Sequence, residues 1–347
     1  MSQLVRVLTV DDSAFARKVI REMLSRSPYI EVVGTARDGM EALEMVEQVK
    51  PDVVTCDLQM PRLDGVGFVR EQMKRRPVRI LILSIAEQDG EQALAALDGG
   101  AVDFVRKPTA LATDELLHIR DELIEKVKAA AAAPLEQVRP VALIPPAVVQ
   151  TRALASTRVS ILVIGISTGG PQALRALIPR FPADFPVPIA IVLHMPVGFT
   201  ALYAAKLGEV CRLEIKEAQE GLVMRPGLAV LAQAGRHLML RRKQGSDEVS
   251  VHLSRQPADL LHRPSVDVLF QSAVEVYGKN VLGVIMTGMG NDGKQGAAWI
   301  KAQGGQVFTE AEKSCVIYGM PRAVVEAGLS DASVPLDRLA EAIMENL

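Results

Sequence analysis

The sequence predicts an α/β protein made of two doubly wound parallel-sheet domains. Its 347 residues are enough for about two domains of ordinary size. Short apolar runs alternate with stretches of helical period through most of the chain, which is typical of βα units and parallel sheets. Near the middle this alternation stops in a segment rich in alanine and proline, which divides the chain into two parts.

The first domain is expected over residues 1–125. Its apolar runs predict strands at residues 4–10, 30–36, 52–56, 78–83 and 102–105. Apolar residues at helical spacing lie between these runs. Ser13 is placed to cap the first helix, a second helix is expected at 39–49, and the last runs from 113 to about 128.

Polar side chains follow the carboxyl ends of these strands, namely Asp11, Asp12, Asp57, Ser84 and Lys107. Ligands bind at this edge of an open α/β sheet. Any one of these residues could be a helix cap or a turn former, and that interpretation would be favoured for Asp11 if it were considered by itself. Three carboxylates on one edge repel each other and favour a hard divalent cation such as Mg²⁺. One carboxylate could then form an acyl phosphate, with Lys107 and Ser84 binding the phosphoryl oxygens.

A linker is expected at residues 126–157, because its scattered prolines cannot lie inside a helix. The second domain is expected over 158–347. Its apolar runs predict parallel strands beginning at 161 and at 188–193, 281–286 and 306–309, and an appended β-hairpin of 237–243 with 248–254. Helices are predicted at 200–207, 265–277, after 293, near 321–326 and at 337–345.

The first strand of the second domain leads into the expected nucleophile. Gly165 breaks the apolar run, Ser167 follows, and Pro171 suits the first turn of a helix. The stretch Gly165-Ile-Ser-Thr-Gly169 fits the Gly-x-Ser-x-Gly elbow that exposes a nucleophilic serine above a sheet. A glycine-rich turn of this kind more often holds a phosphate or a cofactor pyrophosphate, so this stretch alone leaves both interpretations open.

Ser167 needs a general base, and the chain offers His118, His194, His237, His252 and His262. His194 directly follows a predicted parallel strand, on the same edge as Ser167, and is the leading candidate. His262 is a second candidate for the pocket. His237 and His252 belong to the predicted hairpin and are expected to be surface residues.

Asp292 is the candidate for orienting that imidazole. It follows the buried strand at 281–286 and is flanked by glycines that let the backbone turn sharply. The alternative is an ordinary Asn-Asp-Gly turn. The chain order Ser167, His194, Asp292 differs from that of the α/β-hydrolases, so the elbow does not assign that fold family. A triad is defined by its geometry and the roles of its members.

Composition excludes several classes of protein. The net charge is −2, and no basic stripe indicates nucleic-acid binding. No apolar run approaches the roughly 20 residues of a membrane span, and the first residues lack the layout of a secretory signal. Three widely separated cysteines are expected to be reduced and buried. We therefore expect a cytoplasmic protein without membrane insertion or a nucleic-acid partner.

The first domain resembles the receiver domain of two-component response regulators. The resemblance rests on Asp11-Asp-Ser13, Pro51-Asp-Val-Val-Thr-Cys-Asp57, Met60-Pro-Arg-Leu-Asp-Gly65, Ser84 and Lys107-Pro108. It implies a flavodoxin-like fold and Asp57 as the phosphoacceptor. It also implies Mg²⁺ bound by Asp12, Asp57 and the Gln59 backbone carbonyl with Asp11 close by, and Ser84 as the switch hydroxyl.

The second domain resembles the chemotaxis protein-glutamate methylesterases. The resemblance rests on Gly165-Ile-Ser-Thr-Gly-Gly-Pro171, His194-Met-Pro-Val-Gly-Phe-Thr200, His262-Arg-Pro-Ser-Val-Asp267, Thr287-Gly-Met-Gly-Asn-Asp-Gly293 and Gly319-Met-Pro-Arg322. The family's catalytic serine, histidine and aspartate fall on Ser167, His194 and Asp292. Leu193, where glutamine is usual, is one of several small departures, and none of them removes a catalytic group.

The two resemblances imply a phosphorylation-controlled serine hydrolase. It would demethylate glutamate γ-methyl esters on chemoreceptors, with glutamine deamidation by the same acyl chemistry, and a chemotaxis histidine kinase would supply the phosphoryl group. Backbone N–H groups near Thr168 and Met289 are the hypothesis for the oxyanion hole. The family implies no cofactor in the catalytic domain, and implies that the unphosphorylated receiver covers the catalytic edge.

Two other functions are weighed against this one. A nucleotide-binding oxidoreductase would use the glycines of 165–170, but the full Gly-x-Gly-x-x-Gly spacing and a suitable ribose-binding acid are missing. A DNA-binding response regulator would need a helix-turn-helix or a basic stripe, and the sequence shows neither.

Overall fold

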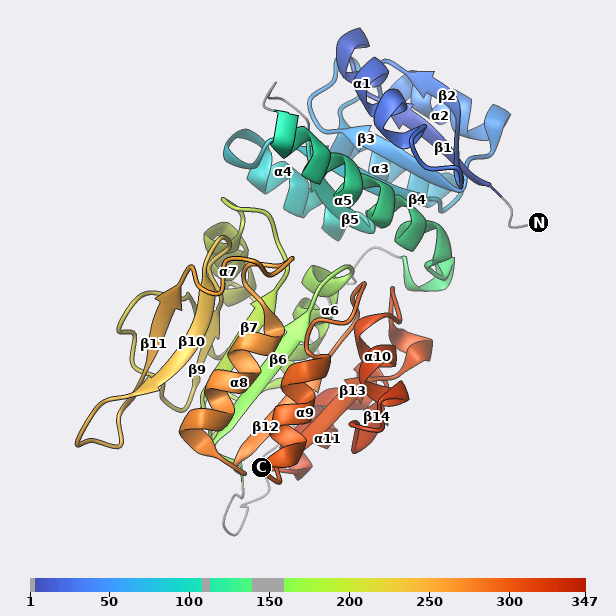
Figure 1. The fold of residues 1–347 in the computed structure, drawn as a ribbon. Coiled ribbons are helices and arrows are strands. Elements are labelled where there is room, and N and C mark those ends of the chain that lie inside the picture. Colours follow the sequence, from blue (N-terminus) through green and yellow to red (C-terminus); the bar gives the residue numbers. More distant parts are fainter. Residues whose placement is uncertain (1–3, 108–112, 139–158) are drawn as a thin grey trace. The chain divides into compact units, whose positions relative to one another are not determined.

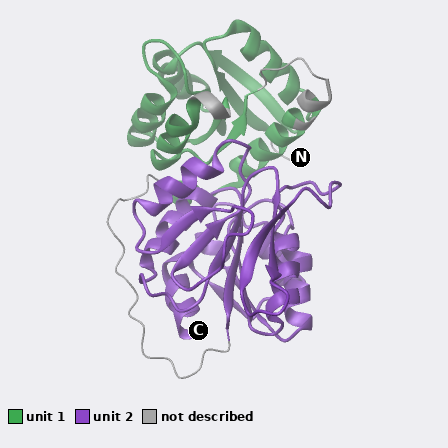
Figure 2. Cartoon of the chain, turned by 90° about the vertical axis from the view of Figure 1, so that its left-hand side faces the viewer, with its two compact units in different colours: residues 1–142 green, residues 143–347 purple. Residues whose placement is uncertain are grey.

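The computed structural model describes residues 4–107, 113–138 and 159–347. The chain forms two compact units, residues 1–142 and residues 143–347, which Figure 2 shows in different colours. Each unit is described by itself. No helix among the described residues is long and apolar enough to cross a membrane.

The N-terminal unit is built on a five-stranded parallel sheet with the order β2-β1-β3-β4-β5. Its strands are β1 (Val5–Val10), β2 (Ile30–Ala36), β3 (Val53–Asp57), β4 (Arg79–Ser84) and β5 (Asp103–Arg106). This is the flavodoxin-like order, in which ligands bind where the direction of winding reverses, beside β1 and β3. The predicted fold of this unit is therefore confirmed.

The helices of this unit begin and end close to the predicted positions (Figure 1). They are α1 (Ala14–Leu24), α2 (Gly39–Val49), α3 (Gly65–Arg75), α4 (Ala86–Asp98) and α5 (Thr113–Ala132), followed by a 3₁₀ turn at Leu135–Gln137. Ser13 caps α1, since its hydroxyl accepts a hydrogen bond from the Ala16 N–H at 3.3 Å. Helix α5 extends into the alanine run because alanine is the best helix former.

The C-terminal unit is built on a seven-stranded parallel sheet with the order β14-β13-β12-β6-β7-β9-β8. Its strands are β6 (Ile161–Ile166), β7 (Ile189–Leu193), β8 (Glu214–Glu217), β9 (Leu228–Leu231), β12 (Val281–Ile285), β13 (Gln306–Glu310) and β14 (Ala332–Val334). The first strand of this unit, β6, lies at the centre between β12 and β7. The winding reverses there, which makes the carboxyl end of β6 the expected place for a site.

Helices cover both faces of this sheet. They are α6 (Gly170–Leu177), α7 (Thr200–Gly208), α8 (Val266–Tyr277), α9 (Lys294–Ala302), α10 (Met320–Glu326) and α11 (Leu336–Glu345), with short 3₁₀ turns at Ile178–Arg180 and Glu312–Ser314. Helices α8, α9 and α10 pack beside one another on one face, and α6 has α7 and α11 as neighbours on the other (Figure 1). The predicted doubly wound architecture of this unit is confirmed.

The predicted hairpin is present as β10 (His237–Arg242) and β11 (Val249–Ser254). It forms a two-stranded sheet of its own, and the Leu240 N–H donates to the Ser272 hydroxyl on α8 at 3.1 Å. Strands β8, β9 and β14 were not predicted, because they are only three or four residues long and give too little of a strand period.

Candidate active site

Ser167 lies in a tight turn between β6 and α6. Gly169 adopts a left-handed backbone (φ +79°), and a Cβ at this position would lie 2.7 Å from the Val316 side chain, so glycine is required there. The Ser167 N–H donates to the Thr287 carbonyl at 3.0 Å, which ties the turn to the segment that follows β12. The serine is 9% exposed. The turn therefore holds one hydroxyl at the central point of the sheet edge.

His194 and Asp292 lie on the same edge. His194 directly follows β7, and its N–H donates to the Ile166 carbonyl of β6 at 3.1 Å. Its Nε2 lies 2.8 Å from Asp292 Oδ2, and both side chains are 9% exposed. An ionised carboxylate can only accept, so Nε2 carries the proton and Nδ1 has the free lone pair.

The other imidazole nitrogen, Nδ1 of His194, is buried and has no hydrogen-bond partner among the described residues. Ser167 and His194 share no hydrogen bond in that part of the chain, so direct proton transfer between them stays a prediction. A buried basic nitrogen beside the serine turn is nevertheless the group that a nucleophilic hydroxyl needs. Catalytic hydrogen bonds are often long in the absence of substrate.

The start of α8 holds the Asp292 carboxylate. Oδ1 accepts from the Ser265 hydroxyl at 2.9 Å and the Asp267 N–H at 3.0 Å, and Oδ2 accepts from the Val266 N–H at 2.8 Å. Burial by itself would raise the pKa of Asp292, but the hydrogen bonds from His194 and from these N–H groups outweigh it and hold the pKa below its usual range. Asp292 is therefore an ionised partner that can stabilise a positively charged imidazole.

His262 stacks on His194. The two ring centroids are 4.1 Å apart and the planes differ by 19°. The stacking limits how the His194 ring can rotate, because its face is already in contact. His262 was the second candidate for the pocket, and it lies there against the face of the candidate base.

The expectation that His237 is a surface residue is wrong. Its side chain is fully buried, because the hairpin packs on α8 and carries His237 inward. Its Nε2 donates to the Pro257 carbonyl at 3.0 Å, and its Nδ1 accepts the Ser265 N–H at 3.2 Å. Burial lowers the pKa of His237, in keeping with a neutral ring that accepts at Nδ1. His237 thus holds Ser265, whose hydroxyl donates to Asp292, and no sequence pattern indicates this role.

The segment after β12 is hydrogen-bonded to the turn that carries Ser167. The Thr287 hydroxyl donates to the Thr168 carbonyl at 2.9 Å, and the Thr287 N–H donates to Glu310 Oε2 at 2.9 Å. Burial raises the pKa of Glu310 to about 7 despite the hydrogen bonds from Thr287 and Ser314. Glu310, at the end of β13, was not singled out from the sequence, because a carboxylate in a short strand gives no signal of burial.

The backbone hydrogen bonds reduce the number of candidate donors for the oxyanion hole. The Gly170 N–H donates to the Ser167 carbonyl at 2.7 Å and is therefore used within the turn. The Met289 N–H has no hydrogen-bond partner among the described residues, and Met289 is partly exposed. Thr168 and Met289 stay the candidate donors. Leu193, at the position where glutamine is usual, is fully buried, and its side chain would lie 2.5 Å from a Cβ placed on Gly170.

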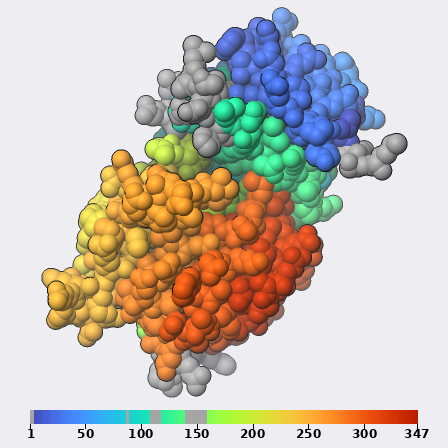
Figure 3. Space-filling view, viewed as in Figure 1, coloured from blue at the N-terminus to red at the C-terminus, as the bar shows by residue number. Residues whose placement is uncertain are grey.

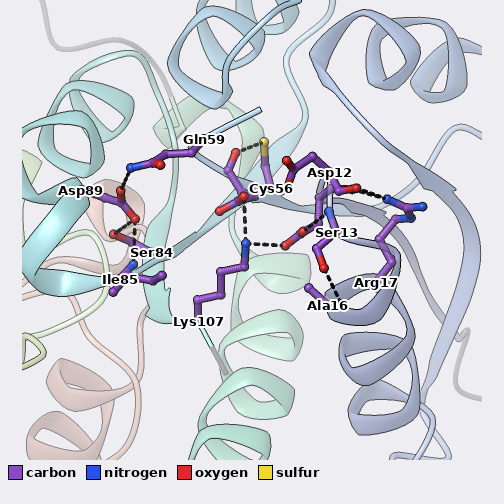
Figure 4. A network of polar contacts seen from close by, with 12 residues as sticks. Asp12, Ser13, Ala16, Arg17, Cys56, Gln59, Ser84, Ile85, Asp89 and Lys107 are labelled. Atoms are coloured by element: carbon purple, nitrogen blue, oxygen red, sulfur yellow. Dashed lines mark hydrogen bonds and ion pairs between the residues drawn. The ribbon is translucent and has the colours of Figure 1, made fainter. Parts of the chain in front are cut away.

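The N-terminal unit has a second polar site at the carboxyl ends of β1, β3 and β5. The Lys107 ammonium lies 2.9 Å from Asp11 Oδ2 and 2.9 Å from Asp57 Oδ2, which Figure 4 shows as a bridge between two carboxylates. Carboxylate oxygens of Asp11, Asp12 and Asp57 all lie within 4.8 Å of one another. Burial raises the pKa of Asp57 to about 6, although Lys107 lowers it.

Ser84 faces a residue that the sequence did not point to. Asp89, buried in α4, lies 3.5 Å from the Ser84 hydroxyl and accepts from the Ile85 N–H at 2.8 Å (Figure 4). It also accepts from the Gln59 side-chain amide at 2.5 Å. Asp89 therefore gives the Ser84 hydroxyl a partner on α4.

An acidic edge on a flavodoxin-like unit, followed by a parallel-sheet unit with serine, histidine and aspartate on one edge, defines a response regulator with a hydrolase output domain. Family models agree: residues 7–119 match the response regulator receiver domain and residues 162–343 match the CheB methylesterase. The chain belongs to the CheB methylesterase family.

Named relatives are similar along the whole chain. One from Myxococcus xanthus, called protein-glutamate methylesterase/protein-glutamine glutaminase 5, is 49% identical over 96% of this chain and 95% of its own length. A relative of the same name, without the number, from Halalkalibacterium halodurans is 42% identical over 99% of both chains. The crystal structure of the Thermotoga maritima CheB methylesterase catalytic domain is 39% identical, with a TM-score of 0.53 over 56% of this chain and 100% of that one.

Proposed function

We propose that this chain hydrolyses glutamate γ-methyl esters on chemoreceptors, under control of phosphorylation at Asp57, and that it deamidates receptor glutamines by the same route. The observation that carries the proposal is the 2.8 Å contact between His194 Nε2 and Asp292, beside the turn of Ser167. The names of the relatives supply the substrate class. We assign the receiver to residues 1–125, the linker to 126–157 and the catalytic domain to 158–347, with α5 continuing to Ala132 inside the proposed linker.

In the first half of the reaction, the Ser167 oxygen attacks the ester carbonyl and His194 Nδ1 takes the hydroxyl proton. Asp292 stabilises the resulting imidazolium. Backbone N–H groups of Thr168 and Met289 would donate to the oxyanion. When the bond between the carbonyl carbon and the methoxy oxygen breaks, the imidazolium returns the proton and methanol leaves. A glutamyl ester of Ser167 remains.

In the second half, water attacks this ester while His194 accepts a proton from it. Collapse of the intermediate breaks the bond to the serine oxygen, which takes the proton back from His194, and the glutamic acid side chain that leaves gives its remaining proton to solvent. A glutamine substrate follows the same sequence with ammonia as the leaving group. No cofactor is required by these steps.

We propose that Asp11, Asp12, Asp57 and the Gln59 backbone carbonyl hold Mg²⁺. The residues fit, because clustered carboxylates and carbonyl oxygens are the ligands that Mg²⁺ prefers. When bound, the cation would neutralise charge on phosphoryl oxygens. Asp57 would then accept the phosphoryl group from a chemotaxis histidine kinase, and Lys107 and Ser84 would bind its oxygens. Both reactions are placed in the cytoplasm, where the three free cysteines stay reduced.

The test is methanol release from methylated receptor membranes. Ser167→Ala should lower the rate by at least about 10³-fold, and Asp57→Asn should keep the unstimulated rate but lose the increase caused by a small acyl phosphate. Undiminished release by Ser167→Ala would refute the catalytic assignment. Stimulation of Asp57→Asn equal to that of the wild type would refute the phosphoacceptor assignment alone.

A further inference from the structure

Two aspartates link the starts of helices α8 and α9, and each accepts hydrogen bonds from the start of the neighbouring helix. Asp292, in the loop before α9, accepts from the first residues of α8, as described above. Asp267, in the first turn of α8, reaches the opposite way: its Oδ1 accepts from the Gly293 N–H at 2.9 Å and the Gly296 N–H at 2.6 Å. Gly293 is the N-cap of α9 and Gly296 lies in its first turn. The two helix starts are therefore cross-linked by two acidic side chains.

Close packing brings the two helix starts together. A Cβ on Gly293 would lie 2.4 Å from the Ile285 side chain and 2.9 Å from that of Val266, and Gly293 has a left-handed backbone (φ +97°). A Cβ on Gly296 would lie 2.6 Å from the Cβ of Phe270. No side chain can stand between the helices at these points. Figure 3 shows α8 and α9, in orange, as one continuous surface.

We propose that Asp267 is a positioning residue for the hydrolysis: its carboxylate fixes the loop that carries Asp292 and so keeps Asp292 on His194. This inference rests on the proposed function, since it assigns Asp292 the role of orienting the base. Asp267 reaches neither Ser167 nor His194 through any hydrogen bond among the described residues, so it acts through the backbone of Gly293 and Gly296.

The two carboxylates need donors at both helix starts. Burial and the negative charge of Asp292 raise the pKa of Asp267 to about 6, against the pull of the Gly296 and Gly293 N–H groups. Two carboxylates so close repel each other when both are ionised. The N–H groups at the two helix starts offset that repulsion. Without an acceptor at position 267, the Gly293 and Gly296 N–H groups lose their partner, and among the described residues Asp292 alone joins the two helix starts by hydrogen bonds.

The experiment compares Asp267→Ala with Asp267→Asn in the full chain, using methanol release from methylated receptor membranes. Asp267→Ala should lower kcat by about 10- to 100-fold, because a misplaced orienting group has effects of this order. KM should change by less than about twofold, since Asp267 is not in the substrate's path in the proposed reaction. Asp267→Asn keeps a carbonyl oxygen for both N–H groups and should retain at least about a third of kcat. Asp337→Ala, an exposed aspartate in the first turn of α11, is the matched control.

A second measurement does not depend on catalysis. The His194 Nε2 proton, hydrogen-bonded to Asp292, should give a downfield proton NMR signal that His194→Gln removes and Asp267→Asn keeps. Asp267→Ala should lose or shift it while the protein remains folded by circular dichroism. A kcat of Asp267→Ala within twofold of the wild type, an unchanged signal, or equal damage in Asp267→Asn would each overturn the proposal. Failure of the proposed function is distinct: Ser167→Ala would then keep its activity, and the NMR comparison would still decide the role of Asp267.

Discussion

Two aspartates on sheet edges are held in opposite ways: Asp57 at the end of β3 in the N-terminal unit, and Asp292 in the loop between β12 and α9 in the C-terminal unit. Asp57 has the Lys107 ammonium, on an unbranched four-carbon side chain, at 2.9 Å and the N–H of Leu58. Asp292 has three donors fixed by the start of α8, besides His194. Burial accordingly raises the pKa of Asp57 to about 6, whereas the donors hold the pKa of Asp292 below its usual range.

The difference matches the proposed roles. A carboxylate whose partner is a flexible lysine can exchange that partner for a cation or a phosphoryl group, as a phosphoacceptor must. A carboxylate held by backbone N–H groups keeps both its charge and its position, as the orienting group of a triad must. Donor type, more than burial, thus distinguishes the reactive carboxylate from the fixed one.

The largest expected effect is that of Asp292→Asn. An amide has one acceptor oxygen, so its NH₂ group would face a donor of α8 or of His194, and the imidazole would lose its ionised partner. Methanol release should fall by about 10³- to 10⁴-fold. Asp184→Asn, at an exposed position, is the control. A variant that keeps a tenth of the wild-type rate would show that the fixed carboxylate is dispensable.

Lys107→Met tests the other side of the comparison. Without the ammonium, Asp57 loses the salt bridge that lowers its pKa, and the phosphoryl oxygens lose the cation that we propose to bind them. The ratio of methanol release with and without a small acyl phosphate should drop by about tenfold or more, an effect of about 1.4 kcal/mol or larger. Lys74→Met, a lysine paired with Glu71 on the surface of α3, should leave that ratio unchanged.

Much of this arrangement could be predicted from sequence. Apolar runs ending in Asp57, Ser167 or His194 place these residues on sheet edges, because the side-chain pattern records burial. The sequence could not give the donors of Asp292, since they are the Ser265 hydroxyl and the backbone N–H groups of Val266 and Asp267, which lie 25 to 27 positions earlier at the start of α8. His237 was misjudged because a hairpin can turn either face inward, and only packing on α8 decides which.

Glu310→Gln extends the comparison to a buried carboxylate with few donors. Burial raises the pKa of Glu310 from 4.5 to about 7, so ionisation opposes folding. When the pKa of an acid is raised in the folded state, the protein has its full stability below the unfolded pKa of that acid. The stability then falls as the pH rises towards the folded pKa. The free energy of unfolding of the wild type should therefore fall between about pH 4.5 and about pH 7, relative to Glu310→Gln, by at most about 3 kcal/mol.

Chemical denaturation at pH 5 and pH 8 measures this difference, and Glu312→Gln, exposed in the next turn, is the control. Glutamine can accept from the Thr287 N–H and donate to the Ser314 hydroxyl, so the turn of Ser167 should keep its geometry and methanol release should stay within about threefold of the wild type. An equal pH dependence in both proteins would mean that Glu310 is not ionised over this range.

The smallest expected effect is that of Arg62→Gln. Arg62 pairs with Asp38 in the N-terminal unit, and the variant compares what backbone N–H donors and a side-chain cation each contribute to holding that carboxylate. Asp38 caps α2 and accepts from the Met40 N–H at 3.0 Å and the Glu41 N–H at 3.1 Å, as well as from Arg62 Nε at 2.8 Å. Burial opposes ionisation, but these donors hold the pKa of Asp38 below its usual value. Since the helix N–H groups remain and the Arg62 side chain is 53% exposed, removing its charge should lower the free energy of unfolding by at most about 1 kcal/mol.

Asp38→Ala removes the cap as well and should lower the free energy of unfolding by about 1 to 2 kcal/mol. If denaturation shows Arg62→Gln to be the more damaging of the two, a mobile cation stabilises a buried carboxylate more than backbone donors do, and the distinction drawn between Asp57 and Asp292 fails.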